Sequence, residues 1–131
     1  MADYLPVYIP AHTITATTSA AVTGGQTLAV SGDGTVGPAG ATSASYIGVA
    51  GHDAASGARV TVYARGMVHE TTASGNITAG AQVVAGAAGT VTALAAAVAT
   101  IDETDVNDAR AVIGVALTTA TDTNKVRWMA W

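Results

Sequence analysis

The sequence predicts an all-β protein: a small β-barrel or sandwich-like domain with an internal pseudo-repeat, an extended N-terminal arm and at most one short helix. Its 131 residues include 16 Val, 6 Ile and 20 Thr, whose branched side chains fit a pleated strand better than a helix. Fifteen Gly residues supply turns at short intervals, and the segments between them alternate between apolar and polar residues.

Bulky apolar side chains are scarce in this chain. Half of the residues count as hydrophobic, but 30 residues are Ala, four are Leu and none is Phe. A core built from such small side chains is thin. We therefore expect association with other chains to add stability.

Residues 1–20 differ from the rest because they contain no Gly and carry two prolines. Pro6 and Pro10 exclude a helix, so we expect an extended arm, although residues 12–17 alternate as a strand does. The arm has an apolar cluster that we expect to contact a partner: Tyr4, Leu5, Val7, Tyr8 and Ile9. The alternative is that this segment is simply the first strand of the barrel.

Residues 21–131 form the expected β-rich domain, in which residues 22–64 and 77–130 repeat one pattern. Two blocks align, the first at an offset of 55 residues and the second at an offset of 66: 22–28 with 77–83, and 47–50 with 113–116. The second copy is therefore longer by 11 residues, inserted between Val91 and Ile113.

Each copy reads as strand, tight turn, strand, loop, strand, turn, strand. The Asp33-Gly34 pair predicts the first hairpin, because both residues suit a two-residue turn. The insertion holds the helical candidate, in which Thr100 and Glu103 fit a capping box and the helix runs through Ala109. The predicted strands are 27–30, 35–36, 46–50, 58–64, a linking strand 66–72, 82–85, 112–117 and 125–131.

No pattern in the chain points to catalysis. The absence of Cys excludes a thiolate nucleophile, a disulfide and a Cys-type zinc site. Neighbouring side chains of a strand point to opposite faces, so His69 and Glu70 would not meet as a base and its acid, and the pair His52-Asp53 is equally unsupported by a third group. We expect no enzyme, no catalytic residues and no cofactor.

The acidic run 102–108 invites a calcium interpretation, but it lacks the central Gly and the terminal Glu of a calcium loop. We interpret it as a solvated helix start and expect no metal site. The net charge of −4 argues against a nucleic-acid partner, which requires clustered Lys and Arg. The chain shows no secretion signal and no run long enough to span a bilayer, so we expect a soluble protein with no membrane partner.

The chain ends in the aromatic segment Trp128-Met129-Ala130-Trp131. Two interpretations stay open. Either Trp128 caps the core and Trp131 frays, or both side chains form a subunit interface, because Trp concentrates at the energetic centres of interfaces.

The order and spacing of the motifs resemble one known family. The segments that carry the resemblance are Ala21–Gln26, Val30–Val36, Ile47–Ala50, Val60–Tyr63 and Val112–Leu117. They are similar to the capsid decoration (head cement) proteins of tailed phages. The resemblance implies a structural virion protein, commonly a homotrimer, that binds the major capsid protein on the outer surface of the head shell and is made in the host cytoplasm.

The resemblance also implies a role for the arm, because related proteins use an extended N-terminal segment to add a strand to the shell. The protein would then stabilise the shell against the pressure of packaged DNA. The alternative function is a carbohydrate- or receptor-binding module of a phage fibre or surface structure, which would require an exposed aromatic platform.

Overall fold

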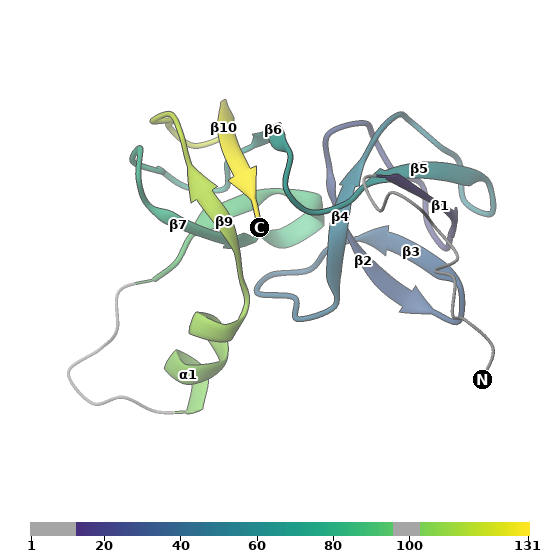
Figure 1. The fold of residues 1–131 in the computed structure, drawn as a ribbon, viewed down its shortest axis with the longest axis horizontal. Coiled ribbons are helices and arrows are strands. Elements are labelled where there is room, and N and C mark those ends of the chain that lie inside the picture. The colour runs from purple at the N-terminus through teal and green to yellow at the C-terminus, as the bar shows by residue number, and fades with distance from the viewer. Residues whose placement is uncertain (1–12, 96–102) are drawn as a thin grey trace, which may run out of the picture.

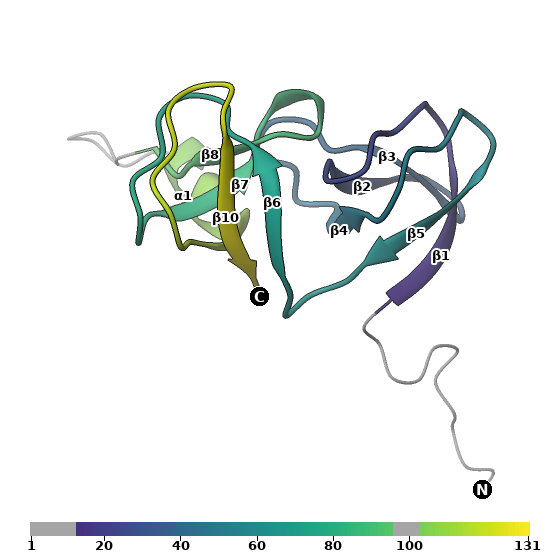
Figure 2. The same ribbon diagram turned by 90° about the horizontal axis from the view of Figure 1, so that it is seen from above.

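The computed structural model describes residues 13–95 and 103–131, which form two five-stranded units lying side by side (Figures 1 and 2). The first unit contains β1 (Thr13–Thr18), β2 (Thr27–Gly32), β3 (Thr35–Pro38), β4 (Tyr46–Ala50) and β5 (Arg59–Tyr63). The second contains β6 (Val68–Thr72), β7 (Gln82–Ala85), the 3-10 turn η1 (Ala87–Gly89), β8 (Val91–Ala93), α1 (Glu103–Arg110), β9 (Val112–Ala116) and β10 (Lys125–Ala130). The predicted all-β class is confirmed.

The two units share one strand order. The first is a closed barrel in the order β1-β3-β2-β4-β5, and the second is a sheet in the order β6-β10-β9-β7-β8. When β1 to β5 are matched in turn to β6 to β10, each strand of the sheet has the same neighbours as its counterpart in the barrel, except that the sheet is open between β6 and β8, the counterparts of β1 and β3. The barrel closes where Thr18 of β1 pairs in parallel with Val36 of β3. At the equivalent place in the second unit, an isolated parallel bridge joins Ala73 to Val91. The pseudo-repeat in the sequence is therefore a repeat of strand pairing.

The repeat extends to irregularities of the pairing. β2 and β4 pair with a bulge that follows the Leu28–Gly48 pair, and β7 and β9 pair with a bulge that follows the Val83–Gly114 pair. A bulge adds one residue to one strand and increases the local twist. Both units carry the bulge after the equivalent residue pair, so the β2–β4 pairing and the β7–β9 pairing repeat the same irregularity.

The predicted hairpins are confirmed. All eight predicted strands are observed within two residues of their expected ends. Gly34 has a φ of 69° between β2 and β3, and Gly89 has a φ of 75° between β7 and β8. These left-handed conformations favour Gly, which has no Cβ to clash with the backbone. The repeated pattern implies a strand after the turn at Gly89, but the sequence did not give the bounds of β8, because it is three residues long and precedes the Ala-rich insertion.

The structure shortens the predicted arm. β1 lies within residues 1–20 but pairs with β5 from Thr13 to Thr17, so these residues belong to the barrel. This agrees with the alternative interpretation for the second half of the segment. The apolar residues predicted to contact a partner, Tyr4, Leu5, Val7, Tyr8 and Ile9, lie outside the described residues.

The predicted linking strand also has a different role. β6 occupies the place in the second unit that β1 occupies in the first, 55 residues earlier. The repeat therefore begins at β1 and β6, earlier than residues 22 and 77. The predicted helix is observed as α1, whereas its expected cap, Thr100, lies outside the described residues. Within the described ranges, no helix is both long and apolar enough to cross a membrane.

Two clusters of buried side chains stabilise the fold. One fills the first barrel and includes Leu28, Val36, Val60 and Val62. The other fills the second sheet and continues into the first unit: Ala29, Ala39, Tyr46, Val49, Ala73, Ile77, Val83, Ala85, Val91, Ile113, Ala116, Ala120, Val126, Trp128 and Ala130. Because residues of both units contribute to the second cluster, the junction between the units is part of the core.

We expect Gly48→Ala and Gly114→Ala each to destabilise the protein by about 1–3 kcal/mol, the usual cost of overpacking. In each variant the added Cβ would meet a backbone carbonyl oxygen, that of Tyr63 or that of Met129. Gly40→Ala is the matched control, because nothing lies within 4 Å of a Cβ there. Urea unfolding measures the difference, and equal midpoints for all three variants would contradict this account.

Candidate functional site

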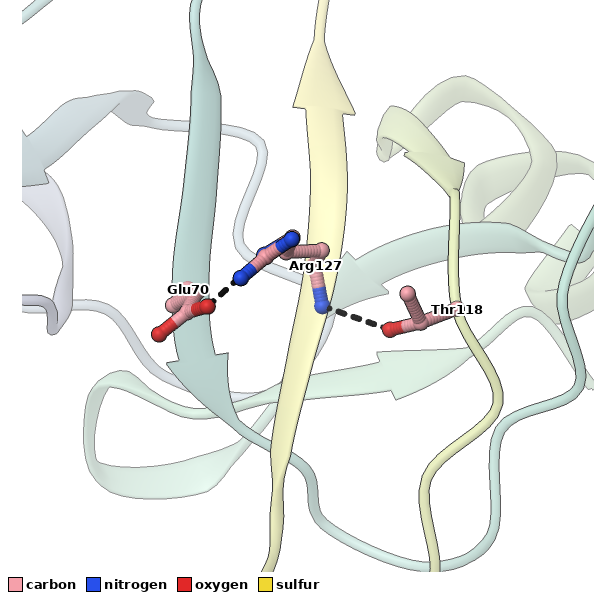
Figure 3. A network of polar contacts seen from close by, with 3 residues as sticks. All are labelled: Glu70, Thr118 and Arg127. Atoms are coloured by element: carbon pink, nitrogen blue, oxygen red, sulfur yellow. Dashed lines mark hydrogen bonds and ion pairs between the residues drawn. The ribbon is translucent and has the colours of Figure 1, made fainter.

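The side chains of the two neighbouring histidine–acid pairs, His69-Glu70 and His52-Asp53, contact other parts of the fold and not each other. His69 is 9% exposed and lies on the inner face of β6, whereas Glu70 lies on the outer face. The Glu70 carboxylate accepts a hydrogen bond of 2.7 Å from Arg127 Nε of β10, and the Arg127 backbone N–H donates to Thr118 Oγ1 at 3.0 Å (Figure 3). The expectation that His69 and Glu70 do not meet is confirmed.

The side chains of His52 and Asp53 each bind backbone groups and do not bind each other. The Thr61 N–H donates to His52 Nε2 at 3.3 Å, so the ring is held with Nδ1 as the donor to the Asp53 carbonyl at 2.9 Å. The Asp53 carboxylate accepts from the Gly24 N–H at 2.8 Å. Both side chains therefore brace loops of the first barrel. Among the side chains that the structure describes, no three of His, Cys, Asp or Glu lie together as a metal site would require.

Trp128 is a core residue. It is fully buried, and its ring centroid lies 5.4 Å from that of His69 and 6.3 Å from that of Tyr46. Its Nε1–H donates to Thr71 Oγ1 at 3.0 Å, and the Thr71 hydroxyl donates to the Gly25 carbonyl of the first unit at 2.9 Å. Of the two interpretations of the C-terminal segment, this burial agrees with the one in which Trp128 caps the core, because the two units of one chain enclose the ring.

Trp131 differs from Trp128 in its exposure. It follows β10, is 47% exposed, and its N–H donates to the Ile113 carbonyl at 3.1 Å. Its side chain lines a small pocket together with Tyr46, Arg65 and Arg110. Trp131 is thus held by the backbone at the edge of the domain and remains available to a partner.

Tyr46 is the most unusual polar residue of this pocket. Its side chain is 6% exposed, and its hydroxyl has no hydrogen-bond partner among the groups that the structure describes. Burial raises the pKa of Tyr46 to about 12, and the positive charge of Arg65 acts in the opposite direction. A buried hydroxyl without a partner costs about 1–3 kcal/mol, so the site has an unmet capacity to donate a hydrogen bond.

An apolar strip runs across the outer face of the second sheet. Val68 of β6 lies opposite Met129 of β10, and Met129 lies opposite Val115 of β9. Val68 is 54% exposed, Met129 is 40% exposed and the nearby Leu117 is 47% exposed. We did not predict this strip, although alternation carried the signal: Met129 lies between the inward-facing residues Trp128 and Ala130, so it must face outward.

The family comparison decides what kind of protein this is. The phage cement protein family matches residues 9–129. The chain belongs to the phage cement protein family. The predicted resemblance is therefore confirmed, and so is the prediction that the protein is structural and not an enzyme, because the family is a structural one.

A solved structure is similar over almost the whole chain. It is described as the crystal structure of the head fiber gp8.5 N base in bacteriophage phi29. The two chains are 22% identical, the match covers 91% of this cement protein and 92% of that chain, and the TM-score is 0.64. At this identity the likeness shows a shared fold. No curated protein sequence matches the chain.

We expect Trp128→Ala to lower the free energy of unfolding by about 3–5 kcal/mol, because it removes a fully buried aromatic ring. Trp131→Ala should change the free energy of unfolding by no more than about 0.5 kcal/mol, because the side chain is half exposed. Chemical unfolding of both variants provides the comparison. Comparable losses in the two variants would contradict the assignment of Trp128 to the core and Trp131 to the surface.

The buried imidazole predicts a pH-dependent stability. Burial lowers the pKa of His69 below its unfolded value of about 6.5. The unfolded state then binds the proton more readily, so stability is fully present above about pH 6.5 and falls as the pH drops through the folded pKa. We expect the thermal midpoint to decrease from pH 7 to pH 5 in the wild type and to decrease less in His69→Phe. The same slope in both proteins would exclude His69 as the cause.

Proposed function

We propose that this cement protein binds the major capsid protein on the outer surface of a phage head shell and stabilises the shell against the pressure of packaged DNA. The observation that carries the proposal is the family match across residues 9–129. The similarity in fold to the base of a phage head fiber supports it. The protein is then a component of the virion capsid, assembled onto the head after synthesis in the host cytoplasm.

The stabilisation follows from mass action. A protein that binds the expanded shell and not the disrupted shell lowers the free energy of the expanded state by an amount set by its concentration relative to its dissociation constant. No covalent chemistry is needed. A small β protein whose hydrogen-bonding groups are used within the fold suits this role, because it presents a fixed surface.

The apolar strip on the second sheet is one candidate contact for the shell or for a neighbouring copy. Val68, Met129 and Leu117 are exposed although they are apolar. Contiguous exposed apolar residues on a small soluble domain often mark an interface. The Arg127–Glu70 ion pair borders the strip and supplies a polar margin.

The N-terminal segment is the second candidate contact. Tyr4, Leu5, Val7, Tyr8 and Ile9 would become buried against the capsid protein, with the backbone adding a strand to a shell sheet. Burial of each large side chain contributes about 1.5–3 kcal/mol before ordering costs are subtracted. Five such residues are enough to make this segment the main determinant of the dissociation rate.

The assembled form that we propose is a homotrimer. The core contains few large side chains, so subunit contacts would add stability, and Trp131 is an exposed aromatic residue able to take part. Three linked copies present three arms at once. Modest single contacts then combine into strong binding through the high effective concentration of the second and third arms.

The alternative, a carbohydrate- or receptor-binding module, needs exposed aromatic side chains arranged as a platform. Among the described aromatic residues, Tyr46 and Trp128 are buried at the junction of the units. Tyr63 and Trp131 are partly exposed, at 38% and 47%. This distribution favours the capsid role over the glycan-binding role.

Deletion of residues 2–10 should leave a folded β domain that binds heads poorly, with the loss mainly in the dissociation rate. The domain should survive because β1 begins at Thr13. Electron microscopy of heads that lack the protein, incubated with wild-type or truncated chain, measures the decoration and shows whether three copies cluster.

The control for this deletion is a full-length variant in which Tyr4, Leu5, Val7, Tyr8 and Ile9 are replaced by Ser. It should bind as poorly as the truncated chain if apolar burial, and not length, supplies the affinity. A truncated protein that decorates heads as well as the wild type would overturn the role of this segment. Wild-type protein that leaves the heads bare would overturn the proposed function.

A further inference from the structure

A small pocket opens at the junction of the two units, where three parts of the chain meet. Arg110 ends α1, Arg65 follows β5, and Tyr46 begins β4. Together with Ile113 of β9 and Trp131 they form most of the lining. The pocket is therefore built by segments that are distant in sequence, and both units contribute to it.

The pocket concentrates positive charge in an acidic protein. The chain has five Lys and Arg residues and a net charge of −4, yet two of the five cations line this one pocket, and the described residues that line it include no Asp or Glu. Neither Arg65 nor Arg110 forms an ion pair with the residues that the structure describes, whereas Arg127 is paired with Glu70. Two guanidinium groups without an acidic partner among the described residues favour an anion at this site.

The size of the pocket restricts the anion. Its volume is about 50 Å³. A water-sized group occupies about 10–15 Å³ by the same measure, so the pocket has room for a group of only a few non-hydrogen atoms. A carboxylate has three such atoms, and a planar guanidinium matches it with two parallel hydrogen bonds. Only one small group of a larger ligand can therefore enter the pocket.

The other walls strengthen this preference. Ile113 is buried and Trp131 is half exposed, so part of the lining is apolar and the local dielectric is lower than that of water. Tyr46 adds a buried hydroxyl that has no partner in the described part of the chain. An anion of three atoms makes too few contacts to bind firmly when free, but the same group on a larger partner benefits from all the surrounding contacts.

We propose that the pocket formed by Tyr46, Arg65, Arg110, Ile113 and Trp131 binds the carboxylate of an Asp or Glu side chain on the head shell protein. The identity of the partner rests on the proposed function. The pocket then acts as a specificity point: Arg65 and Arg110 hold the acidic side chain in a fixed position beside the larger apolar contacts. A shell that lacks an acidic side chain at that position would leave two cations desolvated and unpaired.

The first test uses small probes and the whole chain. In NMR spectra, Nα-acetyl-glutamate N-methylamide should shift the signals of the Arg65 and Arg110 Nε–H groups and the Trp131 indole N–H, saturably at millimolar concentration. The glutamine analogue should not. Arg65→Gln and Arg110→Gln should each weaken the binding of the probe at least tenfold, whereas Arg59→Gln, which removes an exposed cation of β5 outside the pocket, should not.

Inorganic phosphate is the competing probe. Binding of phosphate more tightly than the glutamate probe would overturn the assignment to a carboxylate. Equal shifts from the glutamate and glutamine probes would overturn the anion site itself. Unchanged thermal midpoints of the three variants establish that any loss comes from the pocket and not from unfolding.

The second test measures binding to heads that lack the protein. Arg65→Gln and Arg110→Gln should bind at least tenfold more weakly than the wild type, and Arg59→Gln should bind equally well. If wild-type protein binds and both pocket variants bind with the same affinity, this inference is wrong and the proposed function stands. If wild-type protein does not bind heads, the proposed function is wrong, and the shell protein is excluded as the source of the carboxylate.

Discussion

The burial of Trp128 at the junction of the two units is the constraint on which the rest of the structure depends. A chain with few large side chains has one indole to fill this space, and the polar end of that ring must be satisfied. Thr71 accepts from the indole and donates to the Gly25 carbonyl, so the hydrogen bonds cross from one unit to the other. Gly114 must lack a Cβ, because one would lie 2.9 Å from Trp128 Cε3. Trp128 thus fills the junction, connects the two units by hydrogen bonds through Thr71, and requires a glycine at position 114.

The two units share one pattern of strand pairing, but the side chains at equivalent positions differ in size. Val62 of the first barrel corresponds to Trp128 of the second unit, since they pair with the equivalent residues Ala50 and Ala116. Val112 of the second unit corresponds to Tyr46 of the first. The backbone register is the same in both units, so their shapes are alike. The larger side chains gather at the junction, where they close the core between the units. The repeated strand pairing therefore sets the backbone of each unit, and the larger side chains at non-repeated positions fill the junction between the units.

The polar groups of this cement protein are largely committed to the fold. His52, Asp53 and Thr71 bind backbone groups, and Arg127 pairs with Glu70. A site for catalysis needs converging groups with capacity to spare, whereas these groups are already engaged. Uncommitted surface remains at the apolar strip and at the pocket of Arg65 and Arg110. Such a division of roles suits a protein whose function is to bind a large assembly.

The sequence by itself determined most of the strands, their turns, the short helix, the repeat and the family, because strand alternation and turn chemistry are local properties. It also placed His69 and Glu70 on opposite faces. Only the tertiary structure decided that Thr13–Thr18 closes the barrel, that β6 is the counterpart of β1, that Trp128 is enclosed, and that Arg65 and Arg110 share a pocket. Which strands close a sheet, and which distant side chains then meet, depends on contacts between residues far apart in the chain. Those contacts leave no periodic signal in the sequence.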